Sequence, residues 1–185
     1  MERIAEASPR PRARLIGVVY LLYFLTAISG EVFVGQGRLV LYDAVNLIAH
    51  AFYIALTLLF FYLFKPVNRS LSLLAALFGL LGCANDVLSL FHRAPYNINS
   101  LVFFGPYCLL LGYLIFSSTF LPRILGVLMM FAGVGWLIFR SPFAKHLSTY
   151  LQVLGFLAEL SLCLWLLVMG VNIQRWKEQA GAAVE

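Results

Sequence analysis

The sequence predicts an all-α fold, an integral membrane bundle of six transmembrane helices with both termini in the cytoplasm. Of the 185 residues, 62% are hydrophobic and 11% are charged, whereas roughly 25% of the residues in a soluble domain are charged. The mean hydropathy is +0.91, and a soluble domain of this length has too little interior to bury so much apolar surface. The composition excludes a nucleic-acid partner, a disordered chain and a secreted disulfide scaffold. The lipid bilayer is therefore the first predicted partner.

The first three predicted spans are continuous apolar runs over residues 15–34, 39–64 and 71–91. A bilayer-spanning helix needs about 20 such residues, and the second run is long enough to tilt or to extend past the membrane. The first run follows a basic stretch and resembles a signal peptide, but the charge distribution favours an uncleaved span. A short polar turn at residues 65–70 requires the second and third helices to be antiparallel.

The last three predicted spans cover residues 101–120, 124–139 and 147–171. The fifth span is short, and it follows Pro122, a residue that suits a helix start. None of the six runs shows the alternation of a membrane β-barrel strand. Because every connection is short, we predict a single domain over residues 1–185.

The distribution of Lys and Arg predicts the orientation, because cytoplasmic loops carry an excess of both. Nine of the 13 basic residues lie on one predicted side, in the tails 1–14 and 173–185, in the turn 65–70 and at Arg123. The other side carries Arg38, Arg93, Arg140 and Lys145. We therefore predict that both tails are cytoplasmic, in a multi-pass protein of the inner (plasma) membrane.

Four acidic residues fall inside the predicted spans, where a carboxylate near a helix centre costs ~2.5–3.5 kcal/mol. They are Glu31, Asp43, Asp86 and Glu159. Glu31 and Asp86 have an arginine nearby in the sequence as an ordinary ion-pair partner. Asp43 and Glu159 have no Lys or Arg within a helical turn, so each needs a partner from another helix or stays protonated.

The polar residues gather on helix faces. In the second span Asp43, Asn46 and His50 lie within about 60° of one another. At a rise of about 1.5 Å per residue, His50 and Glu159 lie near the bilayer midplane, and the other polar residues lie nearer the outer side. The set predicts a pocket that opens outward and ends about halfway through the membrane. Its predicted catalytic residues are Asp43, His50 and Glu159, and its predicted substrate-binding residues are Glu31, Asn46, Asn85, Asp86, Tyr107 and Gln152.

Three kinds of protein are compatible with this set. A pocket with carboxylates and a histidine suits acid–base chemistry on a lipid, an isoprenoid or another apolar small molecule, with Asn46 and Gln152 orienting it. Midplane carboxylates also suit a small proton- or cation-coupled transporter. In an accessory or structural subunit the same residues would only join helices. Asp43 with His50 is too small a set to predict a metal site, and the sequence leaves open the cofactor, enzymatic activity and a homo-oligomer.

Two further groups of residues are interpreted as structural. Gly105 with Gly112 and Gly126 with Gly133 are seven residues apart, which returns to nearly the same helix face and indicates close helix packing. Aromatic residues near the predicted membrane boundaries form an interfacial belt without chemistry. The belt consists of Tyr42, Tyr62, Tyr96, Trp136, Tyr150 and Trp176.

Several stretches carry a resemblance to a known family. They are Lys65-Pro66-Val67-Asn68-Arg69-Ser70 with residues 71–78, then residues 102–105 and 111–115, Phe120-Leu121-Pro122-Arg123-Ile124-Leu125-Gly126, Glu159-Leu160-Ser161-Leu162, Trp165-Leu166-Leu167 and Gly170-Val171-Asn172. On these stretches the chain resembles a bacterial family of small polytopic membrane proteins, the domain of unknown function 4386. Tyr107 stands where this family often has His. The resemblance implies the membrane fold, and it implies no particular activity.

Overall fold

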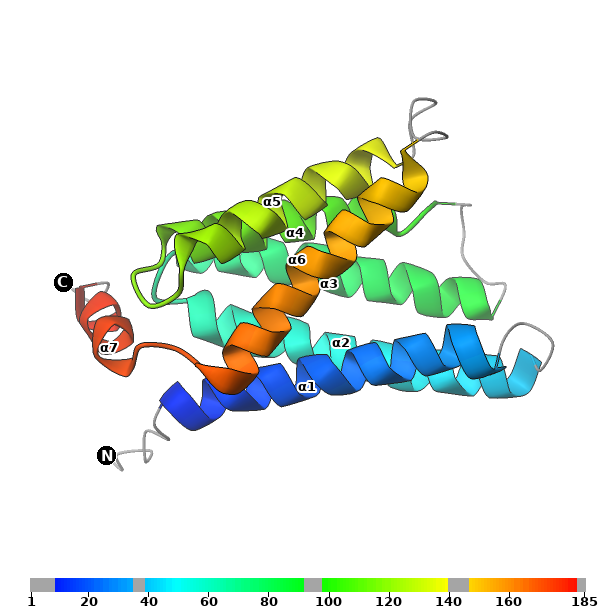
Figure 1. The fold of residues 1–185 in the computed structure, drawn as a ribbon, viewed down its shortest axis with the longest axis horizontal. Coiled ribbons are helices and arrows are strands. Elements are labelled where there is room, and N and C mark those ends of the chain that lie inside the picture. The colour runs from blue at the N-terminus through cyan, green and yellow to red at the C-terminus, as the bar shows by residue number, and fades with distance from the viewer. Residues whose placement is uncertain (1–8, 35–38, 92–97, 140–146, 183–185) are drawn as a thin grey trace.

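The computed structural model of the chain describes residues 9–34, 39–91, 98–139 and 147–182, and Figure 1 shows their arrangement. These residues form seven α-helices and one short π-helix, with no strand among them, so the predicted all-α class is confirmed. In chain order the elements are α1 (Pro9–Ser29), the π-helix η1 (Gly30–Val34), α2 (Leu39–Phe64), α3 (Arg69–Leu90), α4 (Leu101–Ser117), α5 (Arg123–Ile138), α6 (Ser148–Val168) and α7 (Ile173–Ala182).

Local sequence signals set several helix ends. α3 begins after Asn68, whose side chain accepts a hydrogen bond from the Leu71 N–H at 2.9 Å, as an N-cap asparagine does. α5 begins directly after Pro122, as the sequence predicted. α6 ends just before Gly170, whose φ of 69° lies in the left-handed region that commonly follows a helix end. Beyond this glycine lies α7, in a segment that was predicted only as a cytoplasmic tail.

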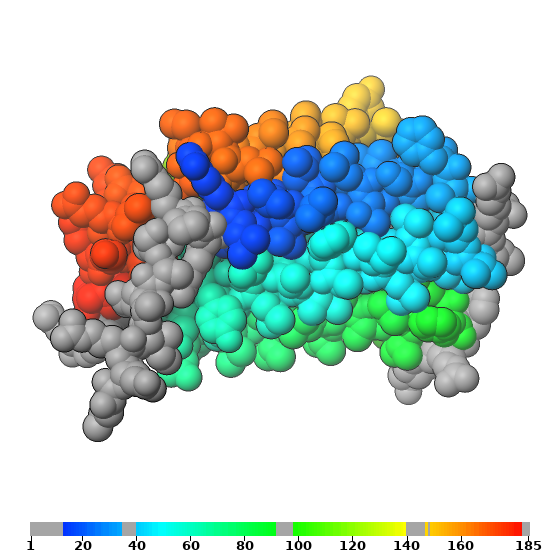
Figure 2. Space-filling model, turned by 90° about the horizontal axis from the view of Figure 1, so that it is seen from below, coloured from blue at the N-terminus to red at the C-terminus, as the bar shows by residue number. Residues whose placement is uncertain are grey.

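The six longer α-helices form a closed bundle, in which each packs against its neighbours along the chain and α6 returns to α1. α6 crosses the other helices obliquely (Figure 1). The start of α1, the α2–α3 and α4–α5 turns, and α7 all lie at one end of the bundle. Figure 2 shows α1 lying between α6 and α2 on one face. On this face α1 therefore separates α2 from α6, the helices that carry the predicted catalytic residues.

Four helical stretches in the described residues are long and apolar enough to cross a membrane. They are Ala13–Val34, Val40–Phe64, Arg69–Leu90 and Thr149–Val168. α4 and α5 are also apolar, but they are shorter, with 17 and 16 residues. Large apolar side chains also face outward, with Phe33 and Val40 being 82% and 85% exposed. Because soluble proteins rarely present such a surface, the chain is a multi-pass helical membrane protein.

The α4–α5 hairpin is held by direct backbone contact. A Cβ added to Gly112 would lie 2.7 Å from the Gly126 carbonyl oxygen, and a Cβ added to Gly126 would lie 2.6 Å from the Gly112 oxygen. Seven residues away along each helix, a Cβ on Gly133 would lie 2.8 Å from the Gly105 oxygen. These contacts confirm the close packing predicted from the glycine spacing.

Candidate functional site

The centre of the candidate site is a contact between His50 on α2 and Asp86 on α3. The His50 Nε2 and Asp86 Oδ2 atoms are 3.2 Å apart, and the His50 Nδ1 atom is 2.7 Å from the Asn46 carbonyl oxygen. A carbonyl oxygen only accepts hydrogen bonds, so the Nδ1 atom carries a proton and donates it. The contact between Nε2 and Oδ2 then needs one more proton, held by the imidazole or by the carboxyl group. The geometry therefore allows the pair to exchange a single proton.

A second set of hydrogen bonds holds Asp86 from the start of α4. Ser100 donates its hydroxyl to the Asp86 Oδ1 atom. The Asn85 side-chain amide donates to the Ser100 Oγ atom at 2.8 Å and to the Ile98 carbonyl oxygen at 2.9 Å. Ser100 is buried, whereas the bond from Asn85 to Ile98 is exposed. These bonds therefore join the end of α3 to the start of α4 at the edge of the bundle. The carboxylate is thus oriented by His50 on one side and by Ser100 on the other.

Glu159 on α6 bonds to a different helix. Tyr20 on α1 donates its hydroxyl to the Glu159 Oε2 atom at 3.0 Å. The indole N–H of Trp136 faces the same carboxylate, and its ring packs on Gly155, where an added Cβ would lie 2.5 Å from the ring. Trp136 was expected only in the interfacial belt, so its polar contact inside the bundle is an addition to that prediction.

Tyr23 and Tyr53 pack against each other near the Glu159 carboxyl group. Tyr23 on α1 is within electrostatic reach of both Asp86 and Glu159. Its ring centroid lies 4.9 Å from that of Tyr53, which is about one helical turn from His50 on α2. Both carboxyl groups therefore belong to one polar interior, which we define as the space among α1, α2, α3, α4 and α6 that contains these side chains.

The polar interior ends at Thr57 on α2 and Tyr107 on α4. Both side chains are buried, and their hydroxyls lie near each other, but neither makes a hydrogen bond of normal geometry to another described group. Beside them is an internal space too narrow for water, with mostly apolar walls. Further toward α7 the interior contains fully buried apolar side chains such as Phe64 and Ile115. The polar residues thus occupy the part of the bundle remote from α7.

Three predicted site residues lie apart from these bonds. Glu31 in η1 accepts a hydrogen bond from the Tyr42 hydroxyl at 2.6 Å, at the far end of α1. Asp43 is half-buried and Gln152 is exposed, and neither makes a side-chain hydrogen bond within the described ranges. The structure brings His50 to Asp86 rather than to Asp43. The convergence of Asp43, His50 and Glu159 on one cavity stays a prediction.

Several predicted residues lie outside the ranges that the structure describes. These are the basic residues of the outer side and one member of the aromatic belt, namely Arg38, Arg93, Arg140, Lys145 and Tyr96.

Five residues of the polar interior are not among the site residues predicted from the sequence. Two of them carried a usable signal, because Tyr53 and Thr57 continue the face of Asn46 and His50 at spacings of three and four residues. The other three are Tyr20, Tyr23 and Ser100. The roles of the two tyrosines depend on α6, which is distant from them in sequence. The role of Ser100 depends on how the end of α3 meets the start of α4.

The part of the chain that the structure describes contains no group of three or more His, Cys, Asp and Glu side chains close enough to hold a metal ion.

The fold and the site together define a class, a multi-pass helical membrane protein with carboxylates in its interior. The model of the family described as a domain of unknown function (DUF4386) matches residues 86–170. A relative from Archaeoglobus fulgidus, described as an uncharacterized protein, is 31% identical over 119 residues, which cover 60% of this chain and 72% of the relative. The chain belongs to the DUF4386 family. No solved structure matches it.

Proposed function

We propose that the chain crosses the inner membrane six times, through α1 to α6, and that both termini are cytoplasmic. The start of α1 and α7 lie at the same end of the bundle, as an even number of spans requires. Lys65, Arg69, Arg123 and Arg175 belong to the turns and helix ends at that end, which favours the cytoplasmic side. A periplasm-specific reporter fused after Glu185 should be inactive, and an active reporter would refute this topology.

We further propose that the polar interior binds the polar end of an apolar molecule, such as an isoprenoid alcohol or another lipid, and acts on it by proton transfer. The observation that carries the proposal is the His50–Asp86 contact at 3.2 Å. With His50 Nδ1 donating to a carbonyl oxygen, this contact holds one exchangeable proton inside an apolar bundle. Ionisable groups placed inside a membrane protein are expensive, and they commonly mark functional sites.

The proposed roles follow from the contacts. The His50–Asp86 pair gives its shared proton to the polar end of the ligand and takes it back afterwards, and Asp86, held by Ser100, orients the imidazole. Glu159, bonded to Tyr20, contacts the polar end from the α6 side. Asn46 supplies the carbonyl that selects the His50 tautomer. Asp43 and Gln152, which make no competing bonds within the described residues, contact the ligand nearer the outer membrane surface.

Titration with farnesol, followed by native mass spectrometry of the purified chain in detergent, tests this function. We expect the wild-type chain to retain farnesol and the His50→Gln and Glu159→Gln variants to lose at least tenfold in affinity, with thermal midpoints close to wild type. Ser161→Ala is the matched control, because its hydroxyl bonds only to the Leu157 carbonyl of its own helix. Equal farnesol retention by all four proteins, or by none, would argue against the binding site.

A small proton-coupled transporter is the second candidate. It is favoured by Thr57 and Tyr107, whose buried hydroxyls extend the polar interior beyond Tyr53 toward the other end of the bundle. In liposomes with an internal pH dye and an imposed potential, a transporter should carry protons inward, and Glu159→Gln should abolish the signal. An unchanged internal pH with the wild-type chain would exclude proton movement without affecting the farnesol result.

A further inference from the structure

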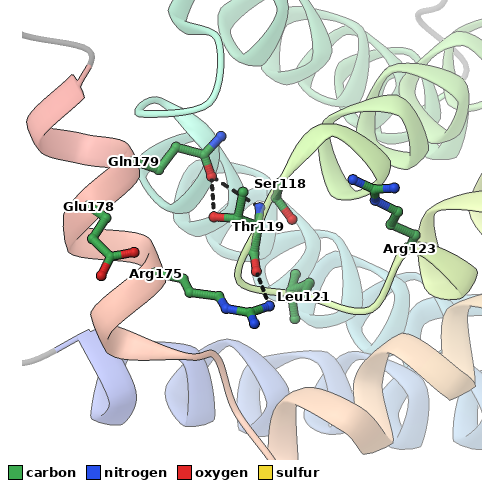
Figure 3. A pocket seen from close by; sticks show the side chains of 7 residues that line it. All are labelled: Ser118, Thr119, Leu121, Arg123, Arg175, Glu178 and Gln179. Atoms are coloured by element: carbon green, nitrogen blue, oxygen red, sulfur yellow. Dashed lines mark hydrogen bonds between the residues drawn. The ribbon is translucent and has the colours of Figure 1, made fainter.

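A second polar site lies at the opposite end of the molecule from η1. A pocket of about 630 Å³ opens between α7 and the α4–α5 turn. Figure 3 shows Arg123 on one side of this pocket, Arg175 and Gln179 on the other, and Thr119 between them. No residue of this pocket belongs to the polar interior described above. A ligand of this pocket would therefore be independent of the proposed ligand of His50 and Glu159.

The walls of the pocket are held in place, because several hydrogen bonds fix α7 to the α4–α5 turn. Gln179 Oε1 accepts hydrogen bonds from the Thr119 backbone N–H and hydroxyl, each at 3.2 Å. Arg175 donates from Nη1 to the Thr119 carbonyl oxygen at 3.3 Å. On the side facing the bundle, the Trp176 indole donates to the Leu63 carbonyl oxygen at 3.1 Å. α7 therefore holds one wall of the pocket in a defined position against the end of the bundle.

The two arginines keep most of their hydrogen-bonding capacity. A guanidinium has five N–H donors, and Arg175 uses one of them on the turn. The Arg123 guanidinium lies 5.7 Å from the ring centroid of Phe116, and neither arginine forms an ion pair within the residues that the structure describes. Glu178 also lines the pocket, but its carboxylate accepts a bond from Gln174 at 3.1 Å on its own helix. The two guanidinium groups thus leave the pocket with a net positive charge.

We propose that this pocket binds the phosphate of an anionic phospholipid in the adjacent leaflet. Arginine matches phosphate oxygens with two parallel N–H donors, and basic pockets at the cytoplasmic ends of membrane helices suit anionic lipid headgroups. The pocket lies where apolar helices end, next to buried Leu121 and the outward-facing Ile124 and Phe116, so acyl chains can follow α5 into the membrane. Lipid binding at this pocket does not depend on the proposed topology, which decides only that the adjacent leaflet is the cytoplasmic one.

Native mass spectrometry of the delipidated full chain, titrated with dioleoylphosphatidylglycerol, tests the site. We expect at least tenfold tighter binding of this lipid than of dioleoylphosphatidylcholine, whose headgroup carries no net charge. Arg123→Gln should lose at least fivefold, because it removes a guanidinium that makes no hydrogen bond in the described chain. Arg175→Lys keeps the charge and loses the planar fork, so we expect at least a twofold loss. Arg69→Gln is the matched control at the same end but outside the pocket, and it should stay within twofold of wild type.

Several results would overturn the proposal. An equal loss in Arg69→Gln would show that general charge attracts the lipid. Wild-type affinity in both Arg123→Gln and Arg175→Lys would exclude the pocket. Binding of glycerol 3-phosphate as tight as binding of the lipid would identify a soluble phosphate compound as the ligand. Tryptophan fluorescence and thermal midpoints check that α7 stays docked, and a failure here leaves the farnesol test of the polar interior unaffected.

Discussion

The α4–α5 hairpin and the sector formed by α1, α2, α3 and α6 are held together in different ways. In the hairpin, facing glycines bring the two backbones into contact, as with Gly112 and Gly126. In the other sector the helices are joined through side chains that donate and accept protons, as in the His50–Asp86 and Tyr20–Glu159 pairs. Both solutions suit a bilayer, where lipid tails are as apolar as the helix surfaces and little hydrophobic force drives helices together.

The difference indicates where function can reside. A backbone contact leaves no volume for a ligand and no group that exchanges a proton. Side-chain hydrogen bonds can be broken and remade with a ligand's polar end. Except for Tyr107, every predicted site residue lies outside the hairpin. The hairpin therefore serves as the rigid part of the bundle, and the sector formed by α1, α2, α3 and α6 carries the candidate chemistry.

Gly126→Ala should produce the largest loss of stability. The new Cβ would lie 2.6 Å from the Gly112 oxygen and from the Phe116 backbone nitrogen, so the hairpin must separate, at a cost of about 1–3 kcal/mol or more. Gly135→Ala is the matched control in the same helix, because its nearest neighbour would be a Leu151 side-chain atom at 3.5 Å. Unfolding in mixed detergent–SDS micelles measures both. Equal losses in the two variants would contradict the backbone-contact explanation.

Asp86→Ala should have the next largest effect. It leaves the His50 Nε2 atom without a partner and the Ser100 hydroxyl proton without its acceptor, which costs about 1–3 kcal/mol. Asp86→Asn keeps a side chain that can accept and donate, so we expect it to recover most of the stability. Asp43→Ala removes a carboxylate with no hydrogen bond in the described chain, and its effect should stay within about 0.5 kcal/mol. If Asp43→Ala were as costly as Asp86→Ala, the assignment of the His50 partner would be wrong.

The Tyr20–Glu159 bond should give a smaller, directly measurable coupling. In a double-mutant cycle of Tyr20→Phe with Glu159→Leu, we expect about 0.6–1.7 kcal/mol, the range for polar pairs inside membrane bundles. The same cycle with Tyr23→Phe is the control. Tyr23 lies within electrostatic reach of Glu159 but makes no hydrogen bond to it among the described contacts. A coupling no larger for Tyr20 than for Tyr23 would argue against the 3.0 Å bond.

The membrane class and the longest helix could be predicted from the sequence, because continuous apolar runs are a local signal. The predicted run 39–64 coincides with α2. The polar partners could not be predicted, because His50 and Asp86 are 36 residues apart in sequence and Tyr20 and Glu159 are 139 apart. α7 was missed as an element for another reason. Its sequence is polar, and it is held by contacts with the α4–α5 turn rather than by an apolar run of its own.

The smallest expected effect concerns two hydroxyls at the α2–α3 interface, near the end of the polar interior. Ser72 donates to the Phe61 carbonyl oxygen at 3.0 Å and is 2% exposed, whereas Thr57 is 1% exposed and has no hydrogen bond of normal geometry among the described groups. Replacing an unsatisfied buried hydroxyl by a methyl group is nearly neutral or stabilising, whereas removing a bonded one costs about 0.5–1.5 kcal/mol. Thr57→Val should therefore keep or raise the free energy of unfolding, and Ser72→Ala should lower it. A larger loss in Thr57→Val than in Ser72→Ala would mean that the Thr57 hydroxyl is bonded, with Tyr107 as the nearest partner, and the polar interior would then be a continuous hydrogen-bonded path to that depth.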